Sequence, residues 1–165
     1  MNMKTREYIE KDKEEAKKIF SQYWNDSGFL EELEKELDSL EYKFYVIEKN
    51  NEVVGIAGLR PAPKHLCAQA DQCATIELYI VASKYKNEGT GSFLVRDVIK
   101  EAKKLGFTEM VCYSPITHND SWSFYEKLDF KKNGIINDPD DGYPGMLWKK
   151  NMEKMIGSTS KCNTW

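Results

Sequence analysis

One short segment is the most informative part of this sequence, because it lies where the hydrophobic pattern changes from strand-like to helix-like. It reads Lys86-Asn87-Glu88-Gly89-Thr90-Gly91-Ser92. Its glycines let the backbone turn tightly, and the first amides of the following helix can cradle an anion such as phosphate. It lacks the third glycine of a dinucleotide-binding loop, because Leu94 stands there, and it has no Gly-Lys-Ser/Thr ending. On its own it therefore predicts either a phosphate site or an ordinary turn.

The residues on either side of this segment predict a strand, a helix and a second strand. Residues 75–82 are rich in β-branched and aromatic side chains, which favour a strand. Apolar residues then recur at helical spacing from Leu94 to Leu105, and Gly106 ends the helix. The next strand follows at 110–113. This order is a βαβ unit, in which we expect parallel strands and a right-handed crossover.

The rest of the chain predicts further strands and helices around this unit. Asp12 and Glu15 have the spacing of a capping box at the start of a helix, and Asn50-Asn51 suits the positive φ angles of a tight hairpin. The other expected elements are a strand at 5–9, a helix with Leu30, Leu33, Leu37 and Leu40 on one face, strands at 44–48, 53–59, 130–132 and 146–149, a helix at 121–128 capped by Thr117 and Asp120, and an acidic turn at 137–142. The expected fold class is α/β (α+β), with a mixed, largely antiparallel sheet flanked by helices. We expect one domain at 1–156 and a flexible tail at 157–165.

The composition fits one globular domain and argues against several protein classes. Of the 165 residues, 41% are hydrophobic and 31% are charged, which is ordinary for a folded domain. The chain has 24 Lys and Arg against 27 Asp and Glu, and the net charge of -3 argues against a nucleic-acid partner. No stretch approaches the roughly 18–20 apolar residues of a membrane span, and the start has no apolar signal core. We therefore expect a cytoplasmic protein with no membrane partner.

The cysteines predict neither a disulfide framework nor a metal site. They are Cys67, Cys73, Cys112 and Cys162. No two of them form a Cys-x-x-Cys pair, and a reducing cytoplasm would keep all of them as thiols. His65 shares a loop with Cys67 and Cys73, but this irregular spacing without a second pair of ligands argues against zinc. Cys112 lies in the middle of a predicted strand, where a small buried thiol is favoured over a nucleophile. We therefore expect no metal.

Three segments together resemble the GCN5-related N-acetyltransferase (GNAT) family. They are Glu77-Leu78-Tyr79-Ile80-Val81, residues 86–92, and Phe124-Tyr125-Glu126-Lys127-Leu128-Asp129-Phe130. The resemblance implies that acetyl-coenzyme A (acetyl-CoA) supplies an acetyl group. It also implies that the pyrophosphate rests on the amides of residues 86–92, and that the pantetheine arm pairs with the strand backbone at Ile80 and Val81.

Several positions near the implied cofactor depart from the family pattern. Lys86 replaces the usual Arg or Gln, which keeps a cation but loses the planar fork. Glu88 adds a negative charge beside the expected phosphates. His118 stands where the family often has Asn, and Asn119 is shifted by one position, so that either could reach the cofactor. These departures leave open a second interpretation, a domain that binds or senses acyl-CoA without catalysis.

Acetyl transfer to an amine needs a base and an acid, and the resemblance implies one residue for each. A primary amine is protonated at neutral pH and must lose a proton before it attacks a thioester, while the departing thiolate gains from a nearby acid. Glu77, on the strand that leads to the cofactor, is the candidate base, and Tyr125 is the candidate acid. The alternatives are that Glu77 is only ion-paired or solvated and that Tyr125 only packs beside Phe124.

The acceptor is expected to be a primary amine on a small molecule or a peptide, acetylated by direct transfer in a ternary complex. Family resemblance places the acceptor near Trp24, Asp26, Glu31 and Tyr143. Residues 26–41 contain seven acidic side chains and one lysine, which favours a cationic acceptor, although a charged helix face is often merely solvated. Whether the protein forms a homodimer stays open.

Overall fold

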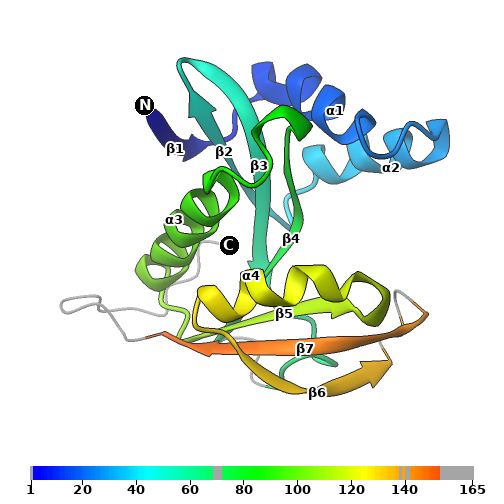
Figure 1. Cartoon of the computed structure of the whole chain (residues 1–165), viewed down its shortest axis with the longest axis vertical. Helices are drawn as coiled ribbons and strands as arrows, with labels where there is room; N and C mark the ends of the chain where they lie inside the picture. The colour runs from blue at the N-terminus through cyan, green and yellow to red at the C-terminus, as the bar shows by residue number, and fades with distance from the viewer. Residues whose placement is uncertain (1, 69–71, 138, 140–141, 153–165) are drawn as a thin grey trace. The chain divides into compact units, whose positions relative to one another are not determined.

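The protein forms a seven-stranded mixed sheet with helices beside it, in the computed structural model shown in Figure 1. The structure describes residues 2–68, 72–137, 139 and 142–152. The strands are β1 (Met3–Glu7), β2 (Lys43–Lys49), β3 (Glu52–Pro61), β4 (Cys73–Val81), β5 (Glu109–Pro115), β6 (Lys131–Asn137) and β7 (Pro144–Asn151). The α-helices are α1 (Lys13–Ser21), α2 (Ser27–Asp38), α3 (Thr90–Lys104) and α4 (Trp122–Lys127), and the 3-10 helices are η1 (Glu10–Asp12), η2 (Ser83–Tyr85) and η3 (Ile116–Ser121).

The strand order is β1-β2-β3-β4-β5-β7-β6. β4 and β5 run parallel, whereas β1 with β2, β2 with β3, β5 with β7 and β6 with β7 are antiparallel. This topology confirms the predicted mixed, largely antiparallel sheet and the parallel pair of the βαβ unit.

The described chain groups into two compact units. The first contains residues 2–60 and 77–98, and the second contains residues 61–76 and 99–152. Strand β4 and helix α3 each contribute residues to both units. One domain at 1–156 stays a prediction, and the tail at 157–165 lies outside the described residues.

The core of the first unit contains the apolar faces of α1 and α2. Ala16, Ile19 and Phe20 of α1 are buried, as their helical spacing predicts. They cluster with Leu33, Leu37, Phe44, Val46, Ile56, Ile80 and Ala82. Each large side chain buried in this way contributes about 1.5–3 kcal/mol to folding. Leu40 was expected to continue the leucine face of α2, but that helix ends at Asp38 and the Leu40 side chain is 94% exposed.

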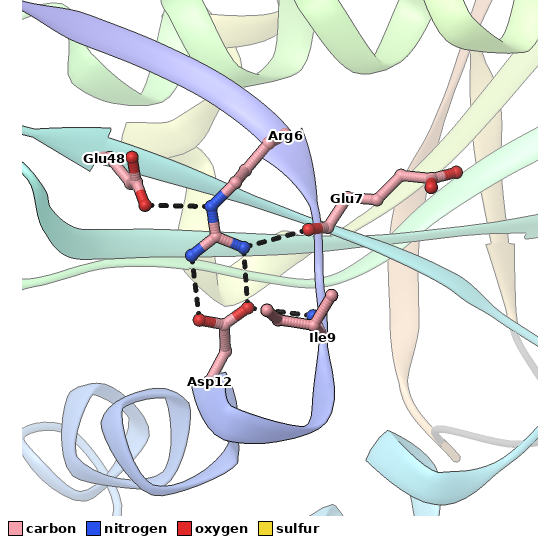
Figure 2. Close-up of polar contacts among 5 residues, drawn as sticks. All are labelled: Arg6, Glu7, Ile9, Asp12 and Glu48. Atoms are coloured by element: carbon pink, nitrogen blue, oxygen red, sulfur yellow. Dashed lines mark hydrogen bonds and ion pairs between the residues drawn. The ribbon is translucent and has the colours of Figure 1, made fainter.

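A polar network connects the end of β1 with η1 and replaces the predicted capping box. Asp12 makes no side-chain hydrogen bond to the start of α1, so its predicted pairing with Glu15 was wrong. Its carboxylate instead accepts two hydrogen bonds from the Arg6 guanidinium, at 2.8 and 2.9 Å, and one from the Ile9 amide at 2.9 Å (Figure 2). Arg6 also donates from Nε to Glu48 at 2.8 Å. Tertiary ion pairing thus outweighs the local capping preference.

The two sides of this network shift each other's pKa. The hydrogen bond to Asp12 is the largest cause of a raised pKa at Arg6. Burial acts to raise the pKa of Asp12, but the hydrogen bonds from Arg6 and Ile9 outweigh it, so that this pKa lies below its ordinary value. Both groups are therefore held in their charged forms.

The hairpin between β2 and β3 turns where the sequence predicts. Asn50 has φ 53° and Asn51 has φ 67°, both in the left-handed region that asparagine tolerates. In the antiparallel pairing of β2 with β3 that follows from this turn, Val46 lies opposite Ile56 and Tyr45 lies opposite Ala57.

The second unit is built on the parallel pair and the antiparallel strands beside it. Residues Cys73–Thr75 of β4 pair with Glu109–Val111 of β5. Gly106 has φ 97° just after α3, which confirms the predicted helix end. The caps predicted for α4 at Thr117 and Asp120 were wrong, because η3 runs directly into α4 and Ser121 takes the cap position. No helix among the described residues is long and apolar enough to cross a membrane.

Cys67 and Cys73 form a disulfide, which contradicts the prediction that they remain thiols. The loop after β3 brings their Cα atoms to 6.5 Å, within the range that a disulfide can bridge. Both residues are buried in a cluster with Ala62, Leu66, Val111 and Leu147. Their spacing in the sequence did not reveal this approach, because it depends on how the loop returns to β4. Cys112 is a buried thiol, as predicted.

Candidate active site

Residues 86–89 form an exposed turn and residues 90–92 begin α3, so this segment leads from β4 into the helix, as the sequence predicts. Asn87 has φ 63° and Gly89 has φ 83°, so that the backbone passes twice through the left-handed region. The Phe93 amide donates to the Gly89 carbonyl at 3.0 Å, and the amides at Thr90, Gly91 and Ser92 precede this first helical bond. Such amides and the positive end of the helix dipole attract anions.

A buried hydroxyl lies at the same helix start. Thr90 is fully buried, and among the described residues its Oγ1 has no hydrogen-bond partner. A buried hydroxyl without a partner costs free energy, so that its position at an anion-binding helix start fits a ligand that accepts a hydrogen bond there. The loop and Thr90 together can therefore hold a pyrophosphate group.

Gly91 lies directly against Tyr79 of β4. A Cβ atom at Gly91 would overlap the Tyr79 hydroxyl oxygen and lie 3.2 Å from Cζ of that ring. Burial raises the pKa of Tyr79 to about 12, so that the phenol stays neutral at physiological pH. The second glycine of the loop is thus required by close packing of α3 on β4.

The acidic residue in the loop has a cationic partner that the sequence did not reveal. The Glu88 carboxylate lies 3.6 Å from Lys49 Nζ, and the Lys49 side chain is only 6% exposed. The same ammonium group lies 4.8 Å from the centre of the Tyr85 ring. Lys86, which departs from the family's Arg or Gln, lies over the Tyr23 ring at 5.0 Å. Lys49 therefore offsets the negative charge that Glu88 adds to the loop.

The end of β4 combines an irregular backbone with buried side chains. Leu78 has φ 53°, an unusual conformation for a leucine within a strand. The side chains of Ile80 and Val81 are buried, and the Val81 carbonyl accepts a hydrogen bond from the Tyr23 hydroxyl at 2.8 Å. No residue pattern predicted the positive φ angle of Leu78, which lies directly after Glu77 in β4.

Glu77 is held by two partners in the first unit. Tyr42 donates to its carboxylate at 2.8 Å, and Arg60 donates to it at 2.9 Å. Burial is the largest cause that raises the pKa of Tyr42, followed by the charge of Glu77. Burial acts to lower the pKa of Arg60, but the hydrogen bond to Glu77 outweighs it and the pKa is raised. Tyr42 and Arg60 belong to no motif, so sequence reasoning missed them.

Tyr125 lies on α4 in the second unit and is held by aromatic packing. Its ring stacks on Trp148 with 5.4 Å between ring centres and meets Phe130 edge-on at 5.7 Å. The ring also contacts Phe124, as the alternative interpretation expected. His118 lies in η3 with Asn119, and the side chains of both are outside the described part of the chain.

The expected acceptor residues lie on exposed surfaces of the two units. Trp24 is 50% exposed, and its ring packs against Phe29 at 5.5 Å. Asp26 accepts a hydrogen bond from the Gly28 amide at 2.9 Å and caps α2, while Glu31 is exposed on that helix. Tyr143, 46% exposed, belongs to the second unit, where its carbonyl accepts a hydrogen bond from Tyr113.

The first unit thus brings together most of the expected site. It contains the glycine loop, the end of β4 with Glu77, and the surface near Trp24 and Asp26. Tyr125, His118, Asn119 and Tyr143 belong to the second unit. In the expected acidic turn, residues 138, 140 and 141 lie outside the described residues.

Comparison with known proteins relates this arrangement to one family. A family model described as the "Acetyltransferase (GNAT) family" matches residues 8–130. N-acetyltransferase family 8 member 3 of Mus musculus is 30% identical over 91 residues, which are 55% of this chain and 39% of that protein. The chain therefore matches well under half the length of that curated relative.

Solved structures share the fold over nearly the whole chain. An aminoglycoside 6′-N-acetyltransferase complexed with coenzyme A has a TM-score of 0.73 at 16% identity, covering 92% of this chain and 98% of its own. A Salmonella typhimurium protein solved with its cofactor acetyl-CoA has a TM-score of 0.70 at 17% identity, covering 94% of this chain and 96% of its own. At such identities the likeness concerns the fold.

Proposed function

This chain belongs to the GNAT acetyltransferase family, and from that membership we propose that it transfers the acetyl group of acetyl-CoA to a primary amine. The observation that carries the proposal is the start of α3. There the exposed turn at residues 86–89 is followed by the amides of residues 90–92 and by the buried Thr90 hydroxyl. A diphosphate group accepts hydrogen bonds from such donors.

The first unit supplies the residues that would bind the donor. In the proposal, the backbone from Lys86 to Ser92 binds the pyrophosphate, and Lys49 keeps the charge of Glu88 balanced beside it. The pantetheine arm pairs with the strand backbone at Ile80 and Val81 in the proposal. In support, the register that joins β4 to β5 is at Cys73–Thr75, and Ile80 and Val81 come after it, beyond the irregular backbone at Leu78. The family resemblance adds His118 and Asn119 of the second unit to the proposed donor site.

The chemistry assigns one proton transfer to each of two residues. Glu77 accepts the proton that the ammonium group of the acceptor releases, through a water molecule. The free amine then forms the new C–N bond as the C–S bond breaks, and the Tyr125 hydroxyl donates a proton to the departing sulfur. The nitrogen loses its second proton to give the neutral amide, and this proton returns through solvent to the Tyr125 oxygen. A carboxylate has about four acceptor positions, so the bonds from Tyr42 and Arg60 leave Glu77 able to accept another. No metal takes part in this proposed step.

The acceptor in the proposal is a cationic amine, on either a small molecule or a peptide. Support comes from the half-exposed Trp24 ring, which is held by Phe29 and has the carboxylates of Asp26 and Glu31 in the same segment. An aromatic face beside carboxylates favours a cation. The family resemblance adds Tyr143 of the second unit to the proposed acceptor residues. Because an aminoglycoside 6′-N-acetyltransferase has the same fold, aminoglycosides are among the amines to test.

A second candidate function has its own support. Because Arg60 and Tyr42 already bind Glu77, this carboxylate could serve only to hold β3 and β4 in register. The chain would then bind acyl-CoA without transferring the acyl group. The two functions differ in turnover and agree in cofactor binding.

Two measurements test the proposal. Acetyl-CoA at saturating concentration should raise the melting temperature, since a ligand that binds only the folded state stabilises it. Release of coenzyme A thiol with a panel of cationic amines should then show turnover. Tyr125→Phe, which keeps the ring on Trp148, and Glu77→Gln should each lower kcat about a hundredfold.

Glu52→Gln, an exposed carboxylate at the start of β3, is the matched control and should keep full activity. Stabilisation by acetyl-CoA without turnover on any amine would favour the acyl-CoA-binding function. No stabilisation at all would contradict both functions.

A further inference from the structure

Two sulfur atoms and one carboxylate meet in the second unit, and none of the three residues is assigned to acetyl transfer. Cys67 lies in the loop after β3, Cys73 begins β4 and Glu109 begins β5. The Oε1 atom of Glu109 lies 3.3 Å from Cys73 Sγ and 3.8 Å from Cys67 Sγ. Both cysteines are buried, at 9% and 2% exposed. Parallel pairing of Cys73 with Glu109 is what brings the carboxylate to the sulfurs.

This arrangement suits the reduced cysteines better than the disulfide. A disulfide sulfur has no hydrogen to donate, so the Glu109 oxygen gains no hydrogen bond from either sulfur while the bond is intact. In the structure, the ligand atoms of Cys67, Cys73 and Glu109 all lie within 4.8 Å of one another. We propose that the reduced pair and Glu109 bind a thiophilic divalent cation such as Zn²⁺. The sequence predicted no metal, because it could not show that Glu109 joins the two cysteines.

The distances and charges are compatible with such a site. Two thiolates at about 2.3 Å from a tetrahedral ion are about 3.8 Å apart. The Cα atoms of Cys67 and Cys73 are 6.5 Å apart, near the upper end of the disulfide range, which leaves room for the sulfurs to separate by side-chain rotation. Two thiolates, one carboxylate and a divalent ion leave one negative charge, and Lys149 Nζ lies 3.9 Å from Glu109 to balance it. Water takes the fourth position.

Reduction and metal binding follow in order. A soluble dithiol passes two electrons and two protons to the Cys67–Cys73 bond and leaves as its own disulfide. The two new thiols then release two protons as the cation binds them as thiolates. Disulfide and bound metal therefore exclude each other, and an oxidant of the disulfide class, which takes up the two electrons, would release the ion.

Co²⁺ is the probe for this site, because thiolate ligation gives it an intense near-ultraviolet absorption band. The full chain is reduced, freed of reductant without air and titrated with Co²⁺, and Zn²⁺ is then added in competition. We expect one Co²⁺ per chain in the reduced protein and none in the oxidised protein. Cys67→Ser and Cys73→Ser should abolish the thiolate band, and Glu109→Gln should weaken binding at least about tenfold.

Cys112→Ser and Cys162→Ser are the matched controls and should keep full binding. Circular dichroism of each variant separates loss of a ligand from loss of the fold. The assignment is overturned if the reduced protein binds no Co²⁺ at micromolar concentration, if binding survives in Cys73→Ser, or if Glu109→Gln binds as tightly as the parent. None of these readouts depends on acetyltransferase activity.

Discussion

Lys49 Nζ lies 3.6 Å from the Glu88 carboxylate, although one residue ends β2 and the other belongs to the loop before α3. Glu88 is about half exposed, whereas the Lys49 side chain is almost fully buried. The pair thus places a positive charge next to the loop that is proposed to bind pyrophosphate. It explains how an acidic residue can occupy this position.

Lys49→Met should weaken coenzyme A binding about two- to fivefold, because it leaves the charge of Glu88 facing the phosphates. The effect should be larger at low ionic strength, where screening is weaker. Isothermal titration calorimetry measures it. Lys4→Met, which removes an exposed lysine of β1, is the control and should change nothing. Adding Glu88→Gln to Lys49→Met should restore most of the affinity, and failure to do so would contradict the role given to the pair.

Gly91→Ala should lower the free energy of unfolding by about 1–3 kcal/mol, because the new methyl group overlaps the Tyr79 hydroxyl. In a Tyr79→Phe protein, Gly91→Ala should cost less free energy of unfolding than it does in the wild type, because the hydroxyl is gone. Part of the cost should remain, since the ring atom Cζ is 3.2 Å from the position of the new Cβ. Urea unfolding of the four proteins measures this.

Gly89→Ala is the comparison within the same loop. Gly89 has φ 83°, and no atom of the described residues lies within 4 Å of the position that a Cβ would take, so the expected cost is conformational, about 1 kcal/mol. Tyr79→Phe should not relieve it. Equal rescue of both alanine variants would show that overlap with Tyr79 is not the cause.

Asp12→Asn should destabilise the protein at neutral pH by about 2–3 kcal/mol, because the Arg6 guanidinium loses its charged acceptor. The pKa of Asp12 is lower in the folded protein than the ordinary value of about 3.9. Its stabilising contribution is therefore complete above that value and is lost as pH falls through the folded pKa. Urea unfolding between pH 7 and pH 2 should show the two proteins converging at the acid end.

Glu48→Gln provides the control for this pH dependence. It removes the negative charge of the other carboxylate that accepts from Arg6 and keeps Asp12 in place. Its effect at pH 7 should be smaller than that of Asp12→Asn. The difference in free energy of unfolding between the wild type and Asp12→Asn should shrink from pH 7 to pH 2. An equal difference at both pH values would contradict the lowered pKa of Asp12.

Reduction of the Cys67–Cys73 disulfide, in the presence of a chelator, should lower the free energy of unfolding by about 2 kcal/mol. The bond closes a loop with a sequence separation of 6, and the entropy of so short a loop gives this magnitude. Urea unfolding with and without a phosphine reductant measures the change. The free energy of unfolding of the double variant Cys67→Ser/Cys73→Ser should not change with reductant. If reductant lowered it as much as in the wild type, the effect would belong to another group.

Local features of the fold could be predicted from the sequence. The positive φ angles at Asn50 and Asn51, the helix end at Gly106 and the buried face of α1 all depend on a few neighbouring residues. The ends of elements were predicted less well. Helix α2 stops before Leu40, and α4 begins without the predicted caps, because tertiary packing competes with weak local preferences.

In the candidate site, too, some residues could be predicted from the sequence and others could not. The glycine loop at the start of α3 could be recognised because its seven residues are contiguous. Tyr42 and Arg60 could not be assigned to Glu77, since they come from the residue before β2 and from β3 and share no motif with it.

The sequence by itself determined the family, the mixed sheet and the place of the glycine loop, because periodicity, turn residues and a contiguous motif are local properties of the chain. Only the tertiary structure decided the partners of Glu77, the pairing of Lys49 with Glu88, and the meeting of Cys67, Cys73 and Glu109. Each of these contacts joins residues from different elements of the chain. Their approach depends on strand register and on the return path of loops, which no short segment encodes.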